Sequence, residues 1–358
     1  MNTKFDTFLG VSSANGFYGY FNQLENVPDM YLYLLKSGPG CGKSSMMKEI
    51  AASALENGQL VELIHCSSDP DSLDGAILWD KKIALLDATP PHAVEPSAPG
   101  VAQEVVNLYQ TIDKGKARSN KDNILKQNKS YKSFHKQAAS SLANASNLVK
   151  NNFYIASSFY DNNKISKFGT DLAKKLITVK DDSSTGHKHL RFLSAVTPRG
   201  IITYDDSIQV LADQIYVIED EYGVCSNSIL EIICNYALNA GNDVFCCGSP
   251  LMPGEKIEIL IIPEQSLAFV TSNSWHEMNF PKQNVIHFQD FINKKIYNQL
   301  QGQLDFNQSI AQKMVDQAIK FQQQAMSGHD KLEEYYNPAV NFDEVNKIRE
   351  KLLKEIFG

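Results

Sequence analysis

The sequence has little arginine, no C-x-x-C motif and no long apolar run. Arginine occurs only four times in 358 residues, so a mechanism that needs an arginine finger has few candidates. The six cysteines include no C-x-x-C pair, which is typical of reduced thiols rather than of a disulfide framework. No apolar run approaches the roughly 20 residues that span a bilayer, and Asp6 lies where a signal peptide would begin its apolar stretch. We therefore expect a cytoplasmic protein that does not contact membranes.

The composition is that of a globular protein, but its charge is uneven. Hydrophobic residues make up 43% of the chain and the net charge is −7, which argues against disorder and against a basic protein that coats nucleic acid. Between Lys114 and Lys150, however, nine Lys or Arg residues oppose a single acid, Asp122. Apolar positions in this stretch recur at helical spacing, so we expect a long helix with one basic face. The lysines of that face are Lys126, Lys129, Lys132 and Lys136.

The two halves of the sequence resemble each other at an offset of 183 residues. At this offset the apolar run at 33–35 meets the run at 216–218, and one inserted residue later His92 meets His276. Glycine and proline positions also coincide along the way. Any two α/β units share strand and helix periodicity, but this does not easily explain the paired glycine, proline and histidine positions. The matches therefore indicate a duplication.

The duplication predicts two domains with the same plan. A polar stretch at residues 181–186 is the expected linker, which leaves domains at residues 1–180 and 188–358. Each domain would be an α/β core, a mostly parallel sheet covered by helices, followed by a helical arm. The arms are expected at about residues 100–180 and 285–358.

Hydrophobic patterning predicts the elements of the first core. Short apolar runs at residues 30–36, 60–65 and 83–87 indicate buried strands. Residues 44–57 have apolar side chains at helical spacing and end at a glycine, as helices often do. From about residue 102 to 176 the period is helical throughout.

A glycine-rich segment at residues 37–44 lies between the first predicted strand and the first predicted helix. It matches the pattern G-x-x-x-x-G-K-[ST], with Ser37 in the place of the first glycine. Glycines let successive backbone N–H groups converge on phosphate oxygens, and the positive end of the following helix adds to their field. Lys43 would reach the β- and γ-phosphates, and the Ser44 hydroxyl would bind Mg²⁺. The expected nucleotide-binding residues are Gly38, Pro39, Gly40, Cys41, Gly42, Lys43, Ser44 and Ser45.

An acid at the end of a neighbouring strand should complete the Mg²⁺ site. Asp87 ends the run at residues 83–87, so it is the predicted partner of Ser44. Many ATPases place a glutamate directly after this acid to orient water, but Ala88 follows here, so rapid hydrolysis is not expected. Other residues could orient water or bind the hydroxyl of an acceptor molecule: Asp69, Asp71, Asp74, Thr89 and His92. The predicted catalytic residues are Lys43, Asp87, Asp69 and His92.

The segment at residues 65–75 is expected to leave the carboxyl edge of the sheet, where ligands bind in open α/β folds. It could hold a second substrate, or it could be a polar turn and helix cap. His65, Cys66, Asp69 and His92 could be imagined as metal ligands, but their spacing matches no standard site and the second half does not keep it.

The second half has lost the features that would bind a phosphate. Ser226 corresponds to Lys43, and the segment at residues 219–221 places three acids where phosphates would lie. Like-charge repulsion should exclude a triphosphate. The sequence therefore predicts one nucleotide site per chain.

With these motifs the chain resembles a family of bacterial tandem P-loop ATPase-like proteins, found in spore-forming and related bacteria. The resemblance is carried by residues 36–44, 65–75 and 86–92, and it extends over nearly the whole chain, including residues 192–200. It implies two P-loop domains and ATP as the nucleotide. Members of that family often have a phosphate loop in both halves, whereas this sequence departs from the pattern in the second.

Three functions are compatible with the sequence. The first is an ATP-dependent conformational switch or slow Mg-ATPase with an unknown small-molecule or protein partner. The second is a small-molecule kinase in which the acids at 69–74 receive the acceptor hydroxyl. The third is a nucleic-acid-associated NTPase that uses the lysine face, with Tyr131 and Phe134 nearby. Because those aromatics share the apolar side of the helix, we expect nucleic acid not to be the partner.

Overall fold

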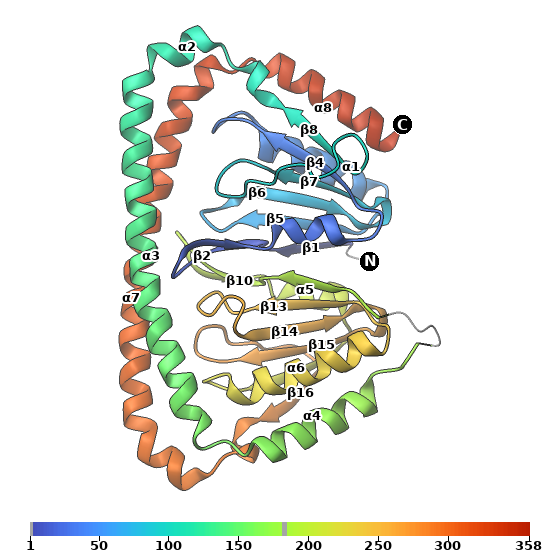
Figure 1. The fold of residues 1–358 in the computed structure, drawn as a ribbon, viewed down its shortest axis with the longest axis vertical. Helices are drawn as coiled ribbons and strands as arrows, with labels where there is room; N and C mark the ends of the chain where they lie inside the picture. The colour runs from blue at the N-terminus through green and yellow to red at the C-terminus, as the bar shows by residue number, and fades with distance from the viewer. Residues whose placement is uncertain (1–2, 181–184) are drawn as a thin grey trace.

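The computed structural model describes residues 3–180 and 185–358, and it has two α/β cores flanked by a pair of long helices (Figure 1). Each core contains a six-stranded mixed sheet. The strand order is β1-β5-β6-β7-β4-β8 in the first sheet and β16-β12-β15-β14-β13-β9 in the second, which is the same order read from the opposite edge. In each sheet one interior strand, β6 or β14, is antiparallel to both neighbours and the other pairs are parallel. The two sheets therefore share one topology.

The sheets are built from short strands, and each core also has a two-stranded hairpin. The first sheet contains β1 (Lys4–Thr7), β4 (Tyr31–Lys36), β5 (Val61–Cys66), β6 (Asp69–Leu78), β7 (Ile83–Asp87) and β8 (Gln103–Asn107). The second contains β9 (Lys188–Arg191), β12 (Gln214–Glu219), β13 (Val244–Gly248), β14 (Ile257–Ile262), β15 (Leu267–Ser272) and β16 (Gln283–His287). The hairpins are β2 (Gly10–Ser13) with β3 (Gly16–Gly19), and β10 (Ser194–Thr197) with β11 (Gly200–Thr203).

The order of the helices is similar in the two halves but not identical. They are α1 (Lys43–Glu56), α2 (Lys114–Ser119), α3 (Lys121–Ser157), α4 (Asn162–Leu176), α5 (Asp206–Leu211), α6 (Val224–Asn239), α7 (Lys294–Tyr336) and α8 (Phe342–Phe357). Helix α1 follows β4, and α6 follows β12 at the corresponding place in the second core.

The main elements of the first core agree with the sequence patterns. Strands β4, β5 and β7 and helix α1 are found where they are predicted. Strand β6 is not predicted, because its first half is polar and rich in aspartate; only the run from Leu73 to Leu78 is buried against its neighbours. Strand β8 lies inside the stretch expected to be helical, since five residues are too few to reveal a period of two. The predicted linker falls mostly on residues 181–184, outside the described residues.

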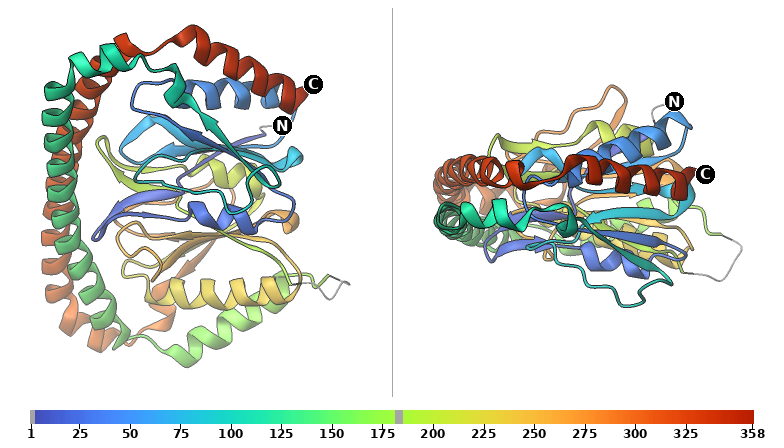
Figure 2. Two further views of the ribbon diagram at one scale, coloured as in Figure 1. Left: turned by 45° about the horizontal axis from the view of Figure 1, so that its top comes forward. Right: turned by 90° about the horizontal axis from the view of Figure 1, so that it is seen from above.

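Helices α3 and α7 pack against each other along one side of both cores (Figures 1 and 2). Small and branched side chains form their contact, including Ala145 on α3 and Ala311 and Val315 on α7. Both helices carry many polar residues on their outer faces. In the described part of the chain, neither they nor any other helix is long and apolar enough to cross a membrane.

The arms do not stay with the core that precedes them. Helix α4, which ends the arm at residues 100–180, packs on α6 of the second core, where Ile165 lies in the same apolar cluster as Ile229. Helix α8 packs on α1 of the first core, where Val345 lies in the same cluster as Met47. The expectation that each arm accompanies its own core is corrected in this respect. Hydrophobic periodicity shows which face of a helix is buried but not which surface covers it.

The two cores are joined directly as well as through the arms. Phe8 and Phe192 exchange backbone hydrogen bonds of 2.8 and 2.9 Å. Beside them, the Arg191 guanidinium donates to both carboxylate oxygens of Glu62, from Nε to Oε1 at 2.5 Å and from Nη2 to Oε2 at 3.0 Å. Both side chains of this ion pair are fully buried. Removing either side chain should strongly destabilise the protein, because the other would remain as an uncompensated buried charge.

Candidate functional site

The candidate site lies where β4 gives way to α1. Residues 37–42 connect the strand to the helix, and Gly40 (φ 68°) and Gly42 (φ 79°) adopt the left-handed conformation that other residues avoid. Gly42 is the N-cap of α1, and no side chain caps this helix. The N–H groups of its first turn are therefore available to an anion, and the helix dipole favours negative charge there.

Lys43 is held over the loop by three contacts. Its ammonium donates to Ser37 Oγ at 2.9 Å and to the Gly38 carbonyl at 3.1 Å, and it lies 3.5 Å from Asp87 Oδ2. Asp87 is brought there because β7 pairs in parallel with β4 and its Cα lies opposite that of Leu35. Ser37 thus takes part in the loop through its hydroxyl, which also donates to the Gly38 carbonyl at 2.9 Å.

Ser44 and Asp87, the residues expected to hold Mg²⁺, each have another contact. Ser44 Oγ accepts a hydrogen bond from the Leu73 N–H at 3.0 Å. Asp87 Oδ1 accepts from the N–H and the hydroxyl of Thr89, at 2.9 and 2.5 Å, which leaves Oδ2 facing Lys43. A hydroxyl and a carboxylate are ligands that suit Mg²⁺. The residues present at this position therefore fit the ion that the sequence predicts.

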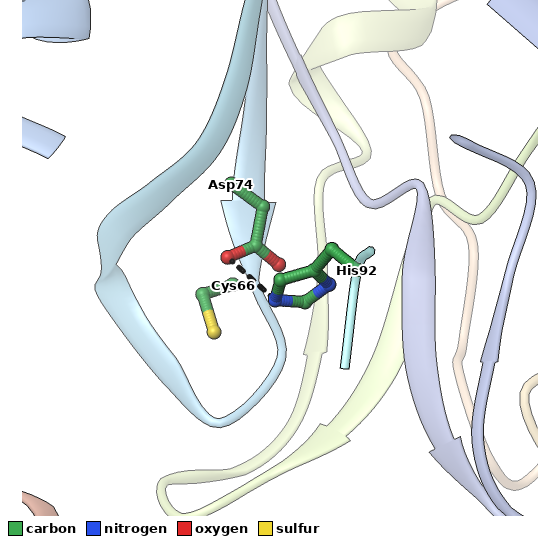
Figure 3. Close-up of side chains that lie close together, drawn as sticks. All are labelled: Cys66, Asp74 and His92. Carbon is green, nitrogen blue, oxygen red and sulfur yellow. Dashed lines mark ion pairs between the residues drawn. The ribbon is translucent and has the colours of Figure 1, made fainter. Parts of the chain in front are cut away.

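The structure separates the other predicted residues. His92 lies beside Asp74, with Nε2 3.4 Å from Oδ1, and Cys66 completes the group in Figure 3. Burial raises the pKa of Asp74, and the nearby Asp87 carboxylate adds to the effect. Asp69 instead accepts a hydrogen bond from Ser72 at 2.5 Å, and no contact among the described residues joins it to Lys43 or Asp87.

Asp71 and His65 are engaged away from the loop. Asp71 is exposed and forms an ion pair with Arg199 of the second core. His65 Nε2 lies 2.8 Å from Asp6 Oδ1, so His65 is not part of the group around His92.

The end of α7 covers the glycine-rich loop between β4 and α1, a contact that could not be predicted from the sequence. Glu333 Oε1 accepts a hydrogen bond from the Gly40 N–H at 3.0 Å. The Asn337 amide lies so close to Gly40 that a Cβ there would approach its Oδ1 to 2.3 Å, and Tyr336 lies beside Gly38. These residues are nearly 300 positions from the loop and carry no motif. Only the crossing of the arms brings them together with it.

The equivalent region of the second core is closed by its own side chains. Residues 220–223 connect β12 to α6, two fewer than in the first core. Asp220 is buried and accepts hydrogen bonds from the Ser226 N–H at 2.8 Å and from the Tyr160 hydroxyl at 2.5 Å. Its carboxylate therefore occupies the amino end of α6. A lysine reappears nearby, because Lys256 lies against Gly223.

Lys256 belongs to a buried polar group in the second core. Its ammonium donates to Glu258 Oε1 at 3.1 Å, and His276 Nε2 lies 3.7 Å from Glu258 Oε2. Burial favours the neutral form of Glu258, but Lys256 and His276 hold its pKa below the ordinary value. Glu258 and His276 correspond in the sequence to Asp74 and His92, so an acid and a histidine meet at the same place in both cores.

Comparison of the chain with protein-family models, with curated proteins and with solved structures found no match.

Proposed function

We propose that the chain is a duplicated P-loop protein that binds Mg-ATP in its first half and responds by a change in the packing of its helical arms. The shared sheet topology and the collinear sequence matches support the duplication. The glycine loop between β4 and α1, with Lys43 above it and Asp87 on the adjacent parallel strand, supports the nucleotide site. The resemblance to tandem P-loop ATPase-like proteins agrees with both.

One observation carries the switch: the contact between the Glu333 carboxylate and the Gly40 N–H. In a P-loop this amide belongs to the set that surrounds the phosphates, so a triphosphate and Glu333 would compete for it. Glu333 lies in the last turn of α7, and α7 packs along α3 beside both cores. Displacing Glu333 would therefore act on an element that contacts α3, β10 of the second core and the loop before α1.

The residues have distinct roles in this proposal. The backbone N–H groups of Gly38 and of residues 40–45, together with the Lys43 ammonium, would hold the triphosphate; Pro39 has no N–H to donate. Ser44 and Asp87 would hold Mg²⁺, which neutralises phosphate charge during phosphoryl transfer. Lys43 would exchange its contact with Asp87 for one with phosphate. Ala88 follows Asp87 and is buried, so no side chain at that position can orient water, and we expect hydrolysis to be slow.

The alternatives have less support. Asp69 and Asp71, two of the acids expected to receive an acceptor hydroxyl in a kinase, are engaged by Ser72 and Arg199. For nucleic acid, the lysine face of α3 is exposed, but Tyr131 packs edge-on against His135 and near His329 of α7 rather than presenting its ring to a base.

The proposal is tested by calorimetric titration of Mg-ATP into the purified chain. We expect one nucleotide per chain, and no detectable binding to the Lys43→Ala variant. Lys48→Ala is the matched control, because Lys48 is on the same helix but donates to the Asp71 carbonyl instead of the loop. Unchanged affinity in Lys43→Ala, or a second bound nucleotide, would reject the assignment.

Hydrogen exchange tests the switch separately from binding. ATP should change amide exchange in the last turns of α7 in the wild type and should leave it unchanged in Lys43→Ala. ADP formation measured with and without a panel of metabolites distinguishes the kinase, which needs an acceptor, from a slow ATPase. Binding of ATP with no change in exchange at α7 would retain the site and remove the switch.

A further inference from the structure

Cys66, Asp74 and His92 form a compact group beside the proposed phosphate site. Their ligand atoms all lie within 4.8 Å of one another, and Figure 3 shows the thiol and the carboxylate on the same side of the imidazole ring. Cys66 ends β5, Asp74 lies on β6 and His92 follows β7, so three segments of one sheet edge supply them. Leu73, adjacent to Asp74, donates its N–H to Ser44. The group is therefore a neighbour of the predicted Mg²⁺ position but uses none of its residues.

The geometry does not fit a nucleophilic relay. A Cys-His-Asp relay needs the thiol at one ring nitrogen and the carboxylate at the other. Here Asp74 faces Nε2, and Nδ1 is buried without a hydrogen-bond partner among the described residues. The thiol, the carboxylate and one ring nitrogen instead lie close to one another, which is the arrangement of ligands around an ion.

The second core shows what the first one lacks. There the equivalent acid and histidine, Glu258 and His276, are accompanied by the buried ammonium of Lys256, which donates to the carboxylate at 3.1 Å. In the first core no Lys or Arg of the described chain forms an ion pair with Asp74, whose side chain is only 5% exposed. Its Oδ2 atom is buried and has no hydrogen-bond partner among these residues, and the same is true of Glu258 Oε2, so the two cores differ in the lysine rather than in the unpaired oxygen. A buried carboxylate is costly unless a cation is paired with it. Cys66 of the first core corresponds to Ser249 of the second, so only the first core has a thiol at this position.

We propose that Cys66, Asp74 and His92 bind a Zn²⁺ ion that has no counterpart in the second core. Sulfur, nitrogen and oxygen ligands together suit Zn²⁺, and three protein ligands leave a fourth position open. The 3.4 Å between His92 Nε2 and Asp74 Oδ1 matches the roughly 3.3 Å expected between two ligands of a tetrahedral ion with bonds of about 2.0 Å. Binding would form one bond each to Sγ, Nε2 and a carboxylate oxygen, and the Cys66 thiol proton would leave to solvent.

The surroundings fix the orientation of the imidazole. Phe17 and Phe21 pack against the His92 ring, with centroids 4.7 and 4.9 Å away. Cys66 is partly buried as a residue, and burial raises the pKa of its thiol. The site goes beyond the proposed ATP function and does not depend on it.

The test uses the full chain freed of metal by a chelator and titrated with Zn²⁺ and with Co²⁺. We expect one ion per chain and, with Co²⁺, a thiolate-to-metal charge-transfer band. Cys66→Ser should remove the band and weaken Zn²⁺ binding by about a hundredfold, because losing a direct ligand should cost at least as much as losing a residue that orients one. Cys247→Ser removes another buried thiol and is the control, which should bind as the wild type does.

Two further variants keep the result interpretable. Asp74→Asn preserves the shape of the side chain and should also weaken Co²⁺ binding, even if Cys66→Ser proves poorly folded by circular dichroism. Lys43→Ala should bind Zn²⁺ normally, which separates this site from the ATP site. A wild-type chain that binds neither ion, or a charge-transfer band that persists in Cys66→Ser, would overturn the proposal.

Discussion

The contact between Glu333 and Gly40 makes a quantitative prediction for ATP affinity. If the carboxylate competes with a triphosphate for the Gly40 N–H, then Glu333→Ala should tighten ATP binding. A hydrogen bond to a charged group contributes about 1.5–3 kcal/mol when well shielded. The Glu333 side chain is 38% exposed, so water weakens the bond and we take a value of about 1 kcal/mol. Because about 1.4 kcal/mol is a tenfold change in an equilibrium constant, the dissociation constant should fall about fivefold.

Glu334→Ala is the matched control for this experiment. Glu334 is the next residue of the same helix, it is exposed, and its removal changes the net charge and the helix propensity equally. Calorimetry on both variants therefore separates the specific contact from a general effect of charge. Equal gains in the two variants would attribute the effect to long-range electrostatics. Weaker binding in Glu333→Ala would place the carboxylate inside the nucleotide site and refute the competition.

Three predictions concern stability. Asp220→Ala should lower the free energy of unfolding in urea by about 1–3 kcal/mol, because the Ser226 N–H and the Tyr160 hydroxyl would lose their buried acceptor; a change within error would show that water replaces it. Arg191→Met should cost about 3–5 kcal/mol by leaving Glu62 charged and buried, and a neutral result would mean that the two cores are held by apolar contacts alone. His189, whose Nε2 lies 3.8 Å from Asp243 Oδ2, and the His187 N–H, which donates to Oδ1 at 2.7 Å, lower the pKa of Asp243 to about 2, below the ordinary 3.8. The contribution of Asp243 is therefore present above pH 3.8 and is lost as the pH falls towards 2. Asp243→Asn should flatten the acid limb of the unfolding curve in that window, and an unchanged acid limb would contradict the assignment.

The local elements of the first core could be predicted from the sequence, because each is specified by neighbouring residues. An apolar run predicts β4, and glycines followed by apolar residues at helical spacing predict the loop and α1. Asp87 is predicted to lie near Lys43 because it ends β7, and the structure places the two side chains 3.5 Å apart. Strand β6 could not be predicted in this way. Its polar first half has the composition of a turn, and only pairing with β5 and β7 makes it a strand.

The candidate sites combine residues that are distant in the sequence, so neighbouring residues alone do not predict which side chains meet. The hypothetical metal set named Cys66 and His92 correctly as neighbours but paired them with His65 and Asp69. The pairing of β5 with β6 is irregular on both sides of His65, which contacts Asp6 instead, and the antiparallel course of β6 brings Asp74 to the group. Glu333 reaches Gly40 only because the arms cross between the cores, a choice of partner that amphipathic periodicity leaves open.

In each core a carboxylate lies near the positive amino end of the helix that follows the glycine-containing loop, but its source and burial differ. This difference indicates which core would respond in the proposed switch. The amino end of α6 is satisfied by Asp220, which is 1% exposed and is fixed by Tyr160 from the end of the first arm. The loop before α1 is contacted by Glu333, a half-exposed side chain from the second arm. An internal, buried carboxylate is hard to displace, whereas one on the surface of a neighbouring helix is not. A ligand anion would therefore act on the first core and move the end of α7, while the second core serves as the fixed support of the arms.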